Sequence, residues 1–298
     1  MTDTLASLRR KIDGAGDLES VVRSMKALAA ASIGQYEKSV LALADYYRTI
    51  ELGLVVCLRN REKTAHEVTE RSGTGVMPVN AVVFGSDQGL VGQFNDQMAD
   101  FAAKTLHALP GEKKVWAVGE RVHARMTDAG FPPVGLFAVP TSVNAITSLV
   151  GQILIENGAH HDAREIVHLY LFRNRPAAGA AYEQVSQRLL PLDEKAEFKL
   201  TKLPWPIKNL PEVIGDEEPT LRALVGEYLF VSIYKACAES LASENASRLA
   251  AMQRAEKNIN ELVDDLNQTF RRLRQSSIDE ELFDVLSGYE SLSKIKAR

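Results

Sequence analysis

All eleven prolines of this 298-residue chain lie between Pro78 and Pro219, so both ends lack the residue that breaks helices most effectively. Apolar residues at both ends recur at intervals of seven positions or, once in the C-terminal row, fourteen. The N-terminal row is Leu8, Ala15, Val22, Ala29, Tyr36, Leu43, Ile50 and Cys57, and the C-terminal row is Leu224, Val231, Ala238, Met252, Ile259, Leu266 and Leu273. Sustained heptads predict two long helices, roughly Asp3 to Leu58 and Thr220 to Leu292, that pair as a coiled coil.

The middle of the chain has a different pattern, with short β-rich runs separated by helical stretches. Strands are predicted at Val79–Phe84, Lys114–Val118, Gly135–Val139 and Glu165–Arg173, with Tyr182–Leu190 as an added edge strand. Helices are predicted at Asn95–Ala108, Glu120–Ala129 and Ser142–Glu156. Such alternation favours a largely parallel sheet. We therefore expect an α/β domain at 77–205, inserted between the halves of an antiparallel coiled coil at 1–60 and 217–298.

An antiparallel pair of these lengths is unequal, at about 80 Å and about 110 Å for a rise of 1.5 Å per residue. The C-terminal helix is then expected to project beyond its partner. A single helix is unstable in water, so we expect a partner to cover the tip, Ile278 to Ile295. The alternative is a hairpin whose tip folds back.

The amino-acid composition excludes several classes of function for this chain. A formal charge of −4 and a pI near 5.9 argue against a general nucleic-acid binder, which leaves proteins as the expected partners. Cys57 and Cys237 are too few for a disulfide framework or a zinc site, which fits a reducing compartment. The first residues contain no apolar signal region, and no apolar run is long enough to span a bilayer. We expect a cytoplasmic protein without a membrane anchor of its own.

The glycine-rich loop Gly85–Gly92 follows the first predicted strand, where α/β folds bind phosphates. It matches neither GxGxxG nor GxxxxGK(S/T), so a tight structural turn is favoured over a nucleotide site. The histidines His160, His161 and His168, near Asp162, lack metal-ligand spacing and are interpreted as loop residues. No catalytic constellation, cofactor site or metal site is predicted.

A dense basic cluster, Arg271, Arg272 and Arg274, precedes Gln275 near the predicted tip. It is either a soluble helix face or a set of fork-shaped donors for carboxylates of an enclosing partner. Polar residues also interrupt the C-terminal heptads. They are Lys235, Asn245 and Glu256, which either fix the register or mark places where the seam faces other chains.

The run SENASRLAAM at 243–252 resembles the SExxxRMxAM motif of the γ subunit of F-type ATP synthase. The similarity continues along the chain to Gly288. The stretch that begins at Ile278 resembles the family's terminal signature ITxExx(D/E)xxxGA. In that signature Asp279 replaces threonine and Tyr289 replaces the final alanine. The loop Ser86–Gly92 is similar to the family's STDRGLCGG run, with Gln88 and Val91 in place of arginine and cysteine.

The N-terminal segment resembles the family's IRxRI…AMKMVAASK run through Leu8–Ile12, Met25-Lys26 and Ala29-Ala30. Leu189–Leu192 matches a further run. The substitutions relative to these family motifs occur together. In this respect the chain resembles the divergent alternate, or N-type, branch of F-type ATPases. The resemblance covers essentially the whole chain and implies a coiled-coil shaft with a Rossmann-like domain at its base.

The resemblance implies a non-catalytic rotor shaft that couples rotation of an ion-driven ring to conformational cycling of catalytic sites on the β subunits. The implied partners are the α, β and ε-type subunits and the membrane c-ring, with the shaft peripheral at the cytoplasmic face of the plasma membrane. By position, Arg274 and Gln275 would contact the β subunit, with Asp279 beside them as an acceptor that requires donors on the partner. Met25, Lys26, Glu244 and Arg248 would form a second contact with β.

Two other classes of function stay open from the residues alone. One is a non-rotating coiled-coil scaffold with an inserted α/β domain, expected to self-associate. The other is a nucleotide-dependent α/β enzyme with helical arms, expected to bind nucleotide through Gly85–Gly92.

Overall fold

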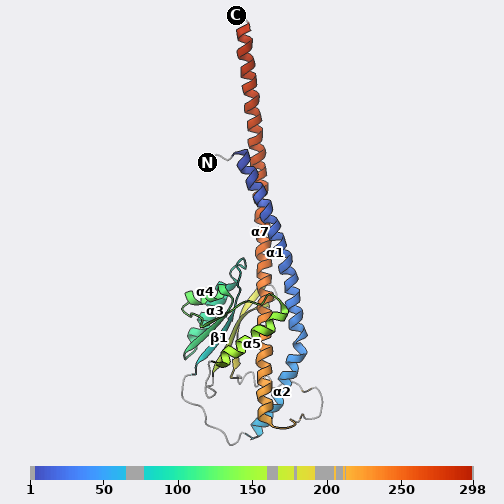
Figure 1. The fold of residues 1–298 in the computed structure, drawn as a ribbon, viewed down its shortest axis with the longest axis vertical. Coiled ribbons are helices and arrows are strands. Elements are labelled where there is room, and N and C mark those ends of the chain that lie inside the picture. Colours follow the sequence, from blue (N-terminus) through green and yellow to red (C-terminus); the bar gives the residue numbers. More distant parts are fainter. Residues whose placement is uncertain are drawn as a thin grey trace. The chain divides into compact units, whose positions relative to one another are not determined.

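The fold is that of a computed structural model, which describes residues 4–64, 77–159, 167–177, 180–191, 205, 211 and 213–296. Its elements are α1 (Leu5–Ala42), α2 (Ala44–Thr64), β1 (Val79–Phe84), α3 (Phe94–Ala108), β2 (Lys113–Val118), α4 (Glu120–Asp128), β3 (Gly135–Phe137), α5 (Val143–Ala159), β4 (His168–Ala177), β5 (Ala180–Leu190) and α7 (Glu217–Lys296). Figure 1 labels these helices and strand β1. The expected class, α/β with long terminal helices, is confirmed.

The strands form one sheet in the order β3-β2-β1-β4-β5. Strands β3, β2, β1 and β4 run parallel to one another, and the edge strand β5 pairs antiparallel with β4. All six residues of β1 are buried, as expected for a central strand covered on both faces. The predicted strands are confirmed to within a few residues, including the added edge strand.

Alternate residues of β1 face two separate cores because successive side chains of a strand point to opposite faces. Val82 and Phe84 pack into a cluster with residues of α2, α5 and α7. Ala81 and Val83 pack into a second cluster with residues of α3 and α4. The sheet is thus covered on one face by α3 and α4 and on the other by α5 and the long helices.

Contacts divide the chain into two units. The terminal unit comprises residues up to 28 and from 249 onward, and the central unit comprises residues 29–248. Both α1 and α7 contribute to each unit. The domain boundaries expected near residues 60, 77, 205 and 217 stay a prediction.

The first long helix differs from the expected single helix, Asp3 to Leu58. A one-residue break at Leu43 separates α1 from α2. The Leu43 amide donates to Val40 O at 3.3 Å, a shorter-range bond than the helical one, and the Tyr47 amide then resumes helical bonding to Leu43 O at 2.9 Å. A local tightening of the turn therefore interrupts the helix without proline or glycine.

The N-terminal heptad row is the buried stripe of α1 and α2. Six of its eight members are buried, namely Leu8, Ala15, Ala29, Tyr36, Ile50 and Cys57, and the other two are half-buried. In the central unit, the ring of Tyr47 lies 6.0 Å from that of Tyr228, and Gly53 faces Leu224. A residue further along α2 thus contacts a residue earlier on α7, which confirms that the two helices pair antiparallel.

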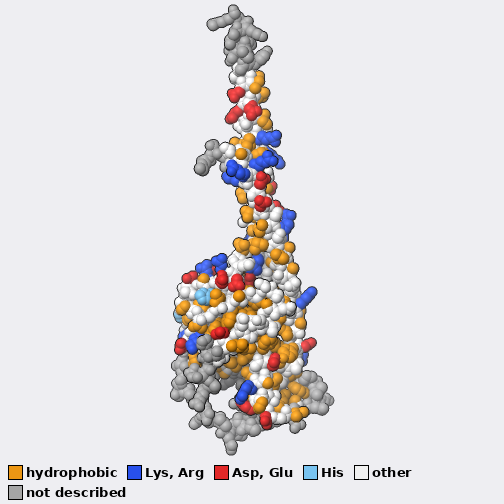
Figure 2. All heavy atoms as spheres, viewed as in Figure 1, with side chains coloured by type: hydrophobic (Ala, Val, Ile, Leu, Met, Phe, Trp, Pro, Cys, Tyr) orange, Lys and Arg blue, Asp and Glu red, His pale blue; other side chains and the backbone are white. Residues whose placement is uncertain are grey.

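Helix α7 runs unbroken for 80 residues. Pro219 occupies its third position, in the first turn, where a backbone N–H has no helical partner in any case. At the other end, every residue from 278 to 287 is exposed. Figure 2 shows apolar side chains beside charged ones along this stretch; the most exposed large ones are Ile278, Leu282, Phe283, Val285 and Leu286. Residues 278–287 of the predicted tip are therefore uncovered by the described residues.

Candidate functional site

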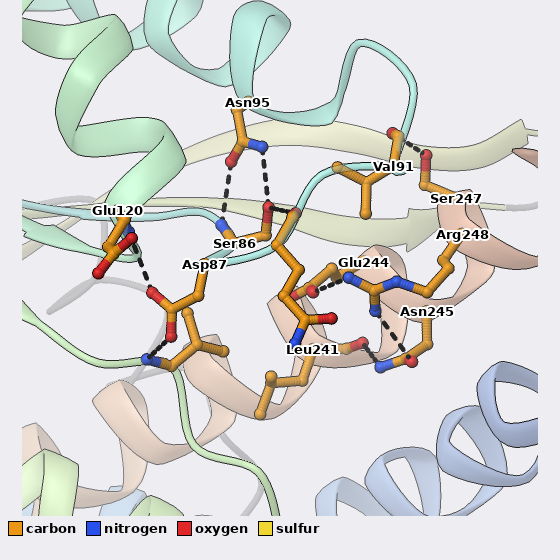
Figure 3. Close-up of polar contacts among 12 residues, drawn as sticks. Ser86, Asp87, Val91, Asn95, Glu120, Leu241, Glu244, Asn245, Ser247 and Arg248 are labelled. Carbon is orange, nitrogen blue, oxygen red and sulfur yellow. Dashed lines mark hydrogen bonds and ion pairs between the residues drawn. The ribbon is translucent and has the colours of Figure 1, made fainter. Parts of the chain in front are cut away.

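Side-chain hydrogen bonds hold the loop after β1. Asn95, at the start of α3, accepts a hydrogen bond from the Ser86 amide at 2.9 Å and donates to Ser86 Oγ at 2.8 Å. Ser86 Oγ donates in turn to Gln88 O at 2.9 Å, as drawn in Figure 3. Asn95 and Ser86 are both buried, so this network fixes the path of the loop.

Asp87 connects this loop to the two strand ends beside it. Its Oδ1 accepts from the Glu120 amide at 3.0 Å and its Oδ2 from the Val139 amide at 2.9 Å (Figure 3). The Glu120 amide belongs to the first turn of α4, the kind of donor that would bind a phosphate. Because a carboxylate of the chain already uses it, the geometry agrees with the predicted structural turn and not with a nucleotide site.

Two glycines let these backbones approach closely. A Cβ at Gly85 would lie 2.3 Å from the Cβ of Val122, and one at Gly119 would lie 2.8 Å from the Ser86 backbone. Gly119 also has a φ of 113°, which disfavours any larger residue. The close approach of Gly85 to α4, and of Gly119 to the loop after β1, therefore requires glycine at both positions.

The SENASR run of α7 faces this edge of the sheet. Ser247 Oγ donates to Val91 O at 2.6 Å, and Ser243 Oγ donates to Asn174 O at 3.3 Å. Both serines are buried. The motif that carries the family resemblance thus attaches α7 to the β1 loop and to β4.

Glu244 and Arg248 form a buried ion pair one helical turn apart on the same stretch of α7. Arg248 Nη2 donates to Glu244 Oε1 at 2.6 Å, and Nη1 donates to Asn245 Oδ1 at 3.4 Å. Burial, opposed by Arg248 and reinforced by Asp87, raises the pKa of Glu244 above its ordinary value. Glu244 Oε2 and Arg248 Nε are buried and have no hydrogen-bond partner among the described residues.

A pocket of about 230 Å³ lies beside this ion pair. Its lining comes from α1, the loop after β1, the loop after β3 and α7, and all of these residues belong to the central unit. Among the lining residues are Asp87, Gln88, Glu244, Asn245 and Arg248. Figure 3 labels four of these, Asp87, Glu244, Asn245 and Arg248. The arrangement can bind a small polar group but offers no nucleophile with an adjacent base.

The structure brings some predicted contact residues together and leaves others apart. Glu244 and Arg248 contact each other, whereas the Lys26 ammonium pairs with Glu256 Oε2 at 2.5 Å in the terminal unit. Met25 is half-buried. Arg274, Gln275 and Asp279 are exposed on α7, as are Arg271 and Arg272.

Sequence reasoning did not assign a role to Asp87, Ser247 or Asn95. Their only sequence signal is position, since they lie in or beside the two motifs that carried the family resemblance. His160 and His161 lie outside the described residues, and within the described ranges no three or more His, Cys, Asp or Glu side chains are placed to hold a metal ion.

A family model described as ATP synthase matches residues 4–292 of the chain. The chain belongs to the ATP synthase family. The ATP synthase gamma chain of Salinibacter ruber is 27% identical to this ATP synthase family member, covering 97% of this chain and 98% of the relative. The gamma chain of Nostoc punctiforme is 28% identical, covering 97% and 99%.

A solved structure shares the fold of this family member. It is a chain of the OSCP/F1/c-ring structure of Euglena gracilis mitochondrial ATP synthase, with a TM-score of 0.62 at 13% identity, covering 97% of this chain and 94% of that one. The predicted γ-subunit family is confirmed, and the N-type branch stays a prediction. No helix in the described ranges has the length and apolar character needed to cross a bilayer.

Proposed function

We propose that this chain is the γ subunit of an F-type ATP synthase, the central shaft that couples ring rotation to conformational cycling of catalytic sites on β subunits. The observation that carries the proposal is helix α7, 80 residues without interruption, in a chain whose family match spans residues 4–292. Bond chemistry would belong to the β subunits. The shaft would act by presenting different surfaces to the three sites as it turns, shifting the nucleotide affinity of each.

The exposed end of α7 supports a surrounding partner. Phe283 is 67% exposed and Val285 is 70% exposed, on a stretch of α7, 278–287, that none of the described elements covers. An apolar helix surface of this kind is costly in water unless a partner covers it. We propose that a ring of alternating α and β subunits encloses this end. The c-ring and an ε-type subunit would be further partners, with the chain peripheral at the cytoplasmic face of the plasma membrane.

Two groups of side chains are proposed to contact β. Arg274 and Gln275 present exposed donors on α7, and Asp279 presents an acceptor one turn further on. The second group is Met25, Lys26, Glu244 and Arg248. The charged members of the second group are already paired within the chain, so they would contact β through their remaining hydrogen-bonding atoms.

Reconstitution tests this function against the scaffold alternative. The α and β subunits encoded beside this chain would be co-expressed with and without it, and ATPase turnover of each preparation measured. We expect the chain to co-purify with α and β and turnover to fall sharply when it is omitted. A chain that self-associates and never binds α and β, or turnover that does not depend on it, would contradict the proposal.

A further inference from the structure

The pocket beside the Glu244–Arg248 ion pair has an unbalanced charge. Its lining includes two carboxylates, Asp87 and Glu244, and one guanidinium, Arg248, and the other lining side chains are uncharged. Two negative charges and one positive charge leave one net negative charge. A polar cavity with this balance attracts a cation rather than an anion.

Hydrogen bonding within the pocket leaves one strong acceptor unused. Both carboxylate oxygens of Asp87 accept from backbone amides. The Arg248 guanidinium donates through Nη2 to Glu244 Oε1 and through Nη1 to Asn245 Oδ1, and its buried Nε has no partner among the described residues. Glu244 Oε2 has no partner among the described residues, although the Glu244 side chain is only 7% exposed. A buried carboxylate oxygen without a donor is costly, so a ligand that supplies one is favoured.

We propose that this pocket binds an alkylguanidinium or alkylammonium group that donates to Glu244 Oε2. Its volume of about 230 Å³ exceeds the roughly 150 Å³ of a cavity that accepts benzene, so one such group with a short alkyl stem fits. The raised pKa of Glu244 agrees with this, because burial outweighs the compensation from Arg248. The cation has two sources: a small molecule in solution, or a lysine or arginine side chain of another subunit. The second source rests on the proposed function.

A substitution at Gln88 can test the site, because this residue lines the pocket. Gln88 is exposed on the loop after β1 and stands where the similar family loop has arginine. Substituting arginine there would supply a guanidinium from the chain itself without changing Glu244 or Arg248. In the Gln88→Arg variant, the introduced guanidinium should occupy the site in place of an external cation.

The test is calorimetric titration of the isolated full chain with n-butylguanidinium, using n-butylurea as the uncharged analogue of the same shape. We expect the guanidinium to bind at least about tenfold more tightly than the urea, the range that one charge-assisted hydrogen bond supports. Glu244→Gln should weaken guanidinium binding by a similar factor. The matched control is Glu218→Gln, since Glu218 and Arg222 form an exposed pair of the same spacing on α7, and binding should be unchanged.

Gln88→Arg keeps the inference testable if Glu244→Gln fails to fold, and it should also abolish binding. Titration of the assembled complex then separates the two sources. Binding that persists in the complex identifies a free cation, and binding that is lost identifies a side chain of another subunit. Equal binding of guanidinium and urea, no binding to the isolated chain, or an equal loss in Glu218→Gln would overturn the inference. A chain that binds the guanidinium but never assembles with α and β contradicts only the proposed function.

Discussion

Arg173 Nε donates to Glu239 Oε2 at 2.6 Å, and this buried ion pair joins strand β4 to helix α7. The same guanidinium donates through Nη1 to Gln187 Oε1 on β5 at 2.9 Å. Ser243 adds a bond to β4, and Ser247 adds one to the loop after β1, so α7 makes polar contacts with both the sheet and this loop of the central unit. Within that unit, α7 is therefore attached to the α/β part by directed polar bonds as well as by apolar packing.

We predict that Arg173→Ala lowers the free energy of unfolding by about 3–5 kcal/mol, because it leaves the Glu239 carboxylate buried without its partner. Denaturant unfolding of the isolated chain measures this change. Arg175→Ala is the matched control, since Arg175 pairs with Glu183 where both side chains are about half exposed, and its cost should stay below about 1 kcal/mol. Equal losses in the two variants would contradict the assignment.

The Lys26–Glu256 pair joins α1 to α7 in the terminal unit. Because both side chains are largely covered, we predict that Lys26→Ala and Glu256→Ala are non-additive, with a coupling free energy of up to about 1 kcal/mol. Exchanging the two charges, Lys26→Glu with Glu256→Lys, should restore most of the stability. Simple additivity in a double-mutant cycle would show that the pair does not fix the register. The exposed Lys257–Glu261 pair serves as the control.

Glycines in the long helices differ in what surrounds them. No atom lies within 4 Å of a Cβ built at Gly34, whereas one built at Gly53 lies 3.0 Å from Leu224 Cδ2. We predict that Gly34→Ala stabilises the chain by up to about 1 kcal/mol through helix propensity and reduced unfolded-state entropy. Gly53→Ala should gain less or lose stability, because Leu224 must move. Thermal unfolding of the two variants makes the comparison, and a larger gain at Gly53 would contradict it.

The sequence predicted the regular features of this fold well because they are periodic. The heptad row from Leu8 to Cys57 is the buried stripe of α1 and α2, and the strand at Val79–Phe84 has the predicted bounds. The break at Leu43 could not be predicted, since it rests on one backbone bond to Val40 O and no breaker residue marks it. The bond between Ser247 and Val91 joins residues 156 apart, a separation at which no local pattern is informative.

The polar interruptions of the C-terminal heptads have separate explanations. Glu256 has its partner, Lys26, within the same chain, so at this position the register interpretation is supported. The Lys235 ammonium lies 5.5 Å from the centre of the Tyr47 ring, a cation–π contact in the central unit. Asn245 donates to Leu241 O on its own helix and also lines the pocket. At this position the polar residue therefore faces the proposed cation site rather than a partner in the heptad seam. Sequence alone could not distinguish these three cases.

The stability of the chain should depend on pH through Glu244. Burial, opposed by Arg248 and reinforced by Asp87, raises the pKa of Glu244 above its ordinary value of 4.5. The folded state then holds this proton more tightly than the unfolded state, so stability present below pH 4.5 is lost as pH rises through the folded pKa. We predict that the wild-type chain loses stability relative to Glu244→Gln as pH rises from 4.5. Parallel denaturation curves measure the difference, and a constant difference or one of opposite sign would contradict it.

Arg274 and Gln275 are exposed on α7 and lie in the stretch proposed to turn inside the α–β ring. We predict that Arg274→Ala and Gln275→Ala lower the ATPase turnover of the assembled complex without preventing assembly, because each removes a donor to the β subunit while leaving the helix seam intact. Arg254→Ala and Gln253→Ala change the same residue types at exposed positions five to six turns earlier on α7, and serve as controls. Their turnover should stay near that of the unmodified complex. Unchanged turnover in an intact complex carrying Arg274→Ala or Gln275→Ala would remove that residue from the mechanism.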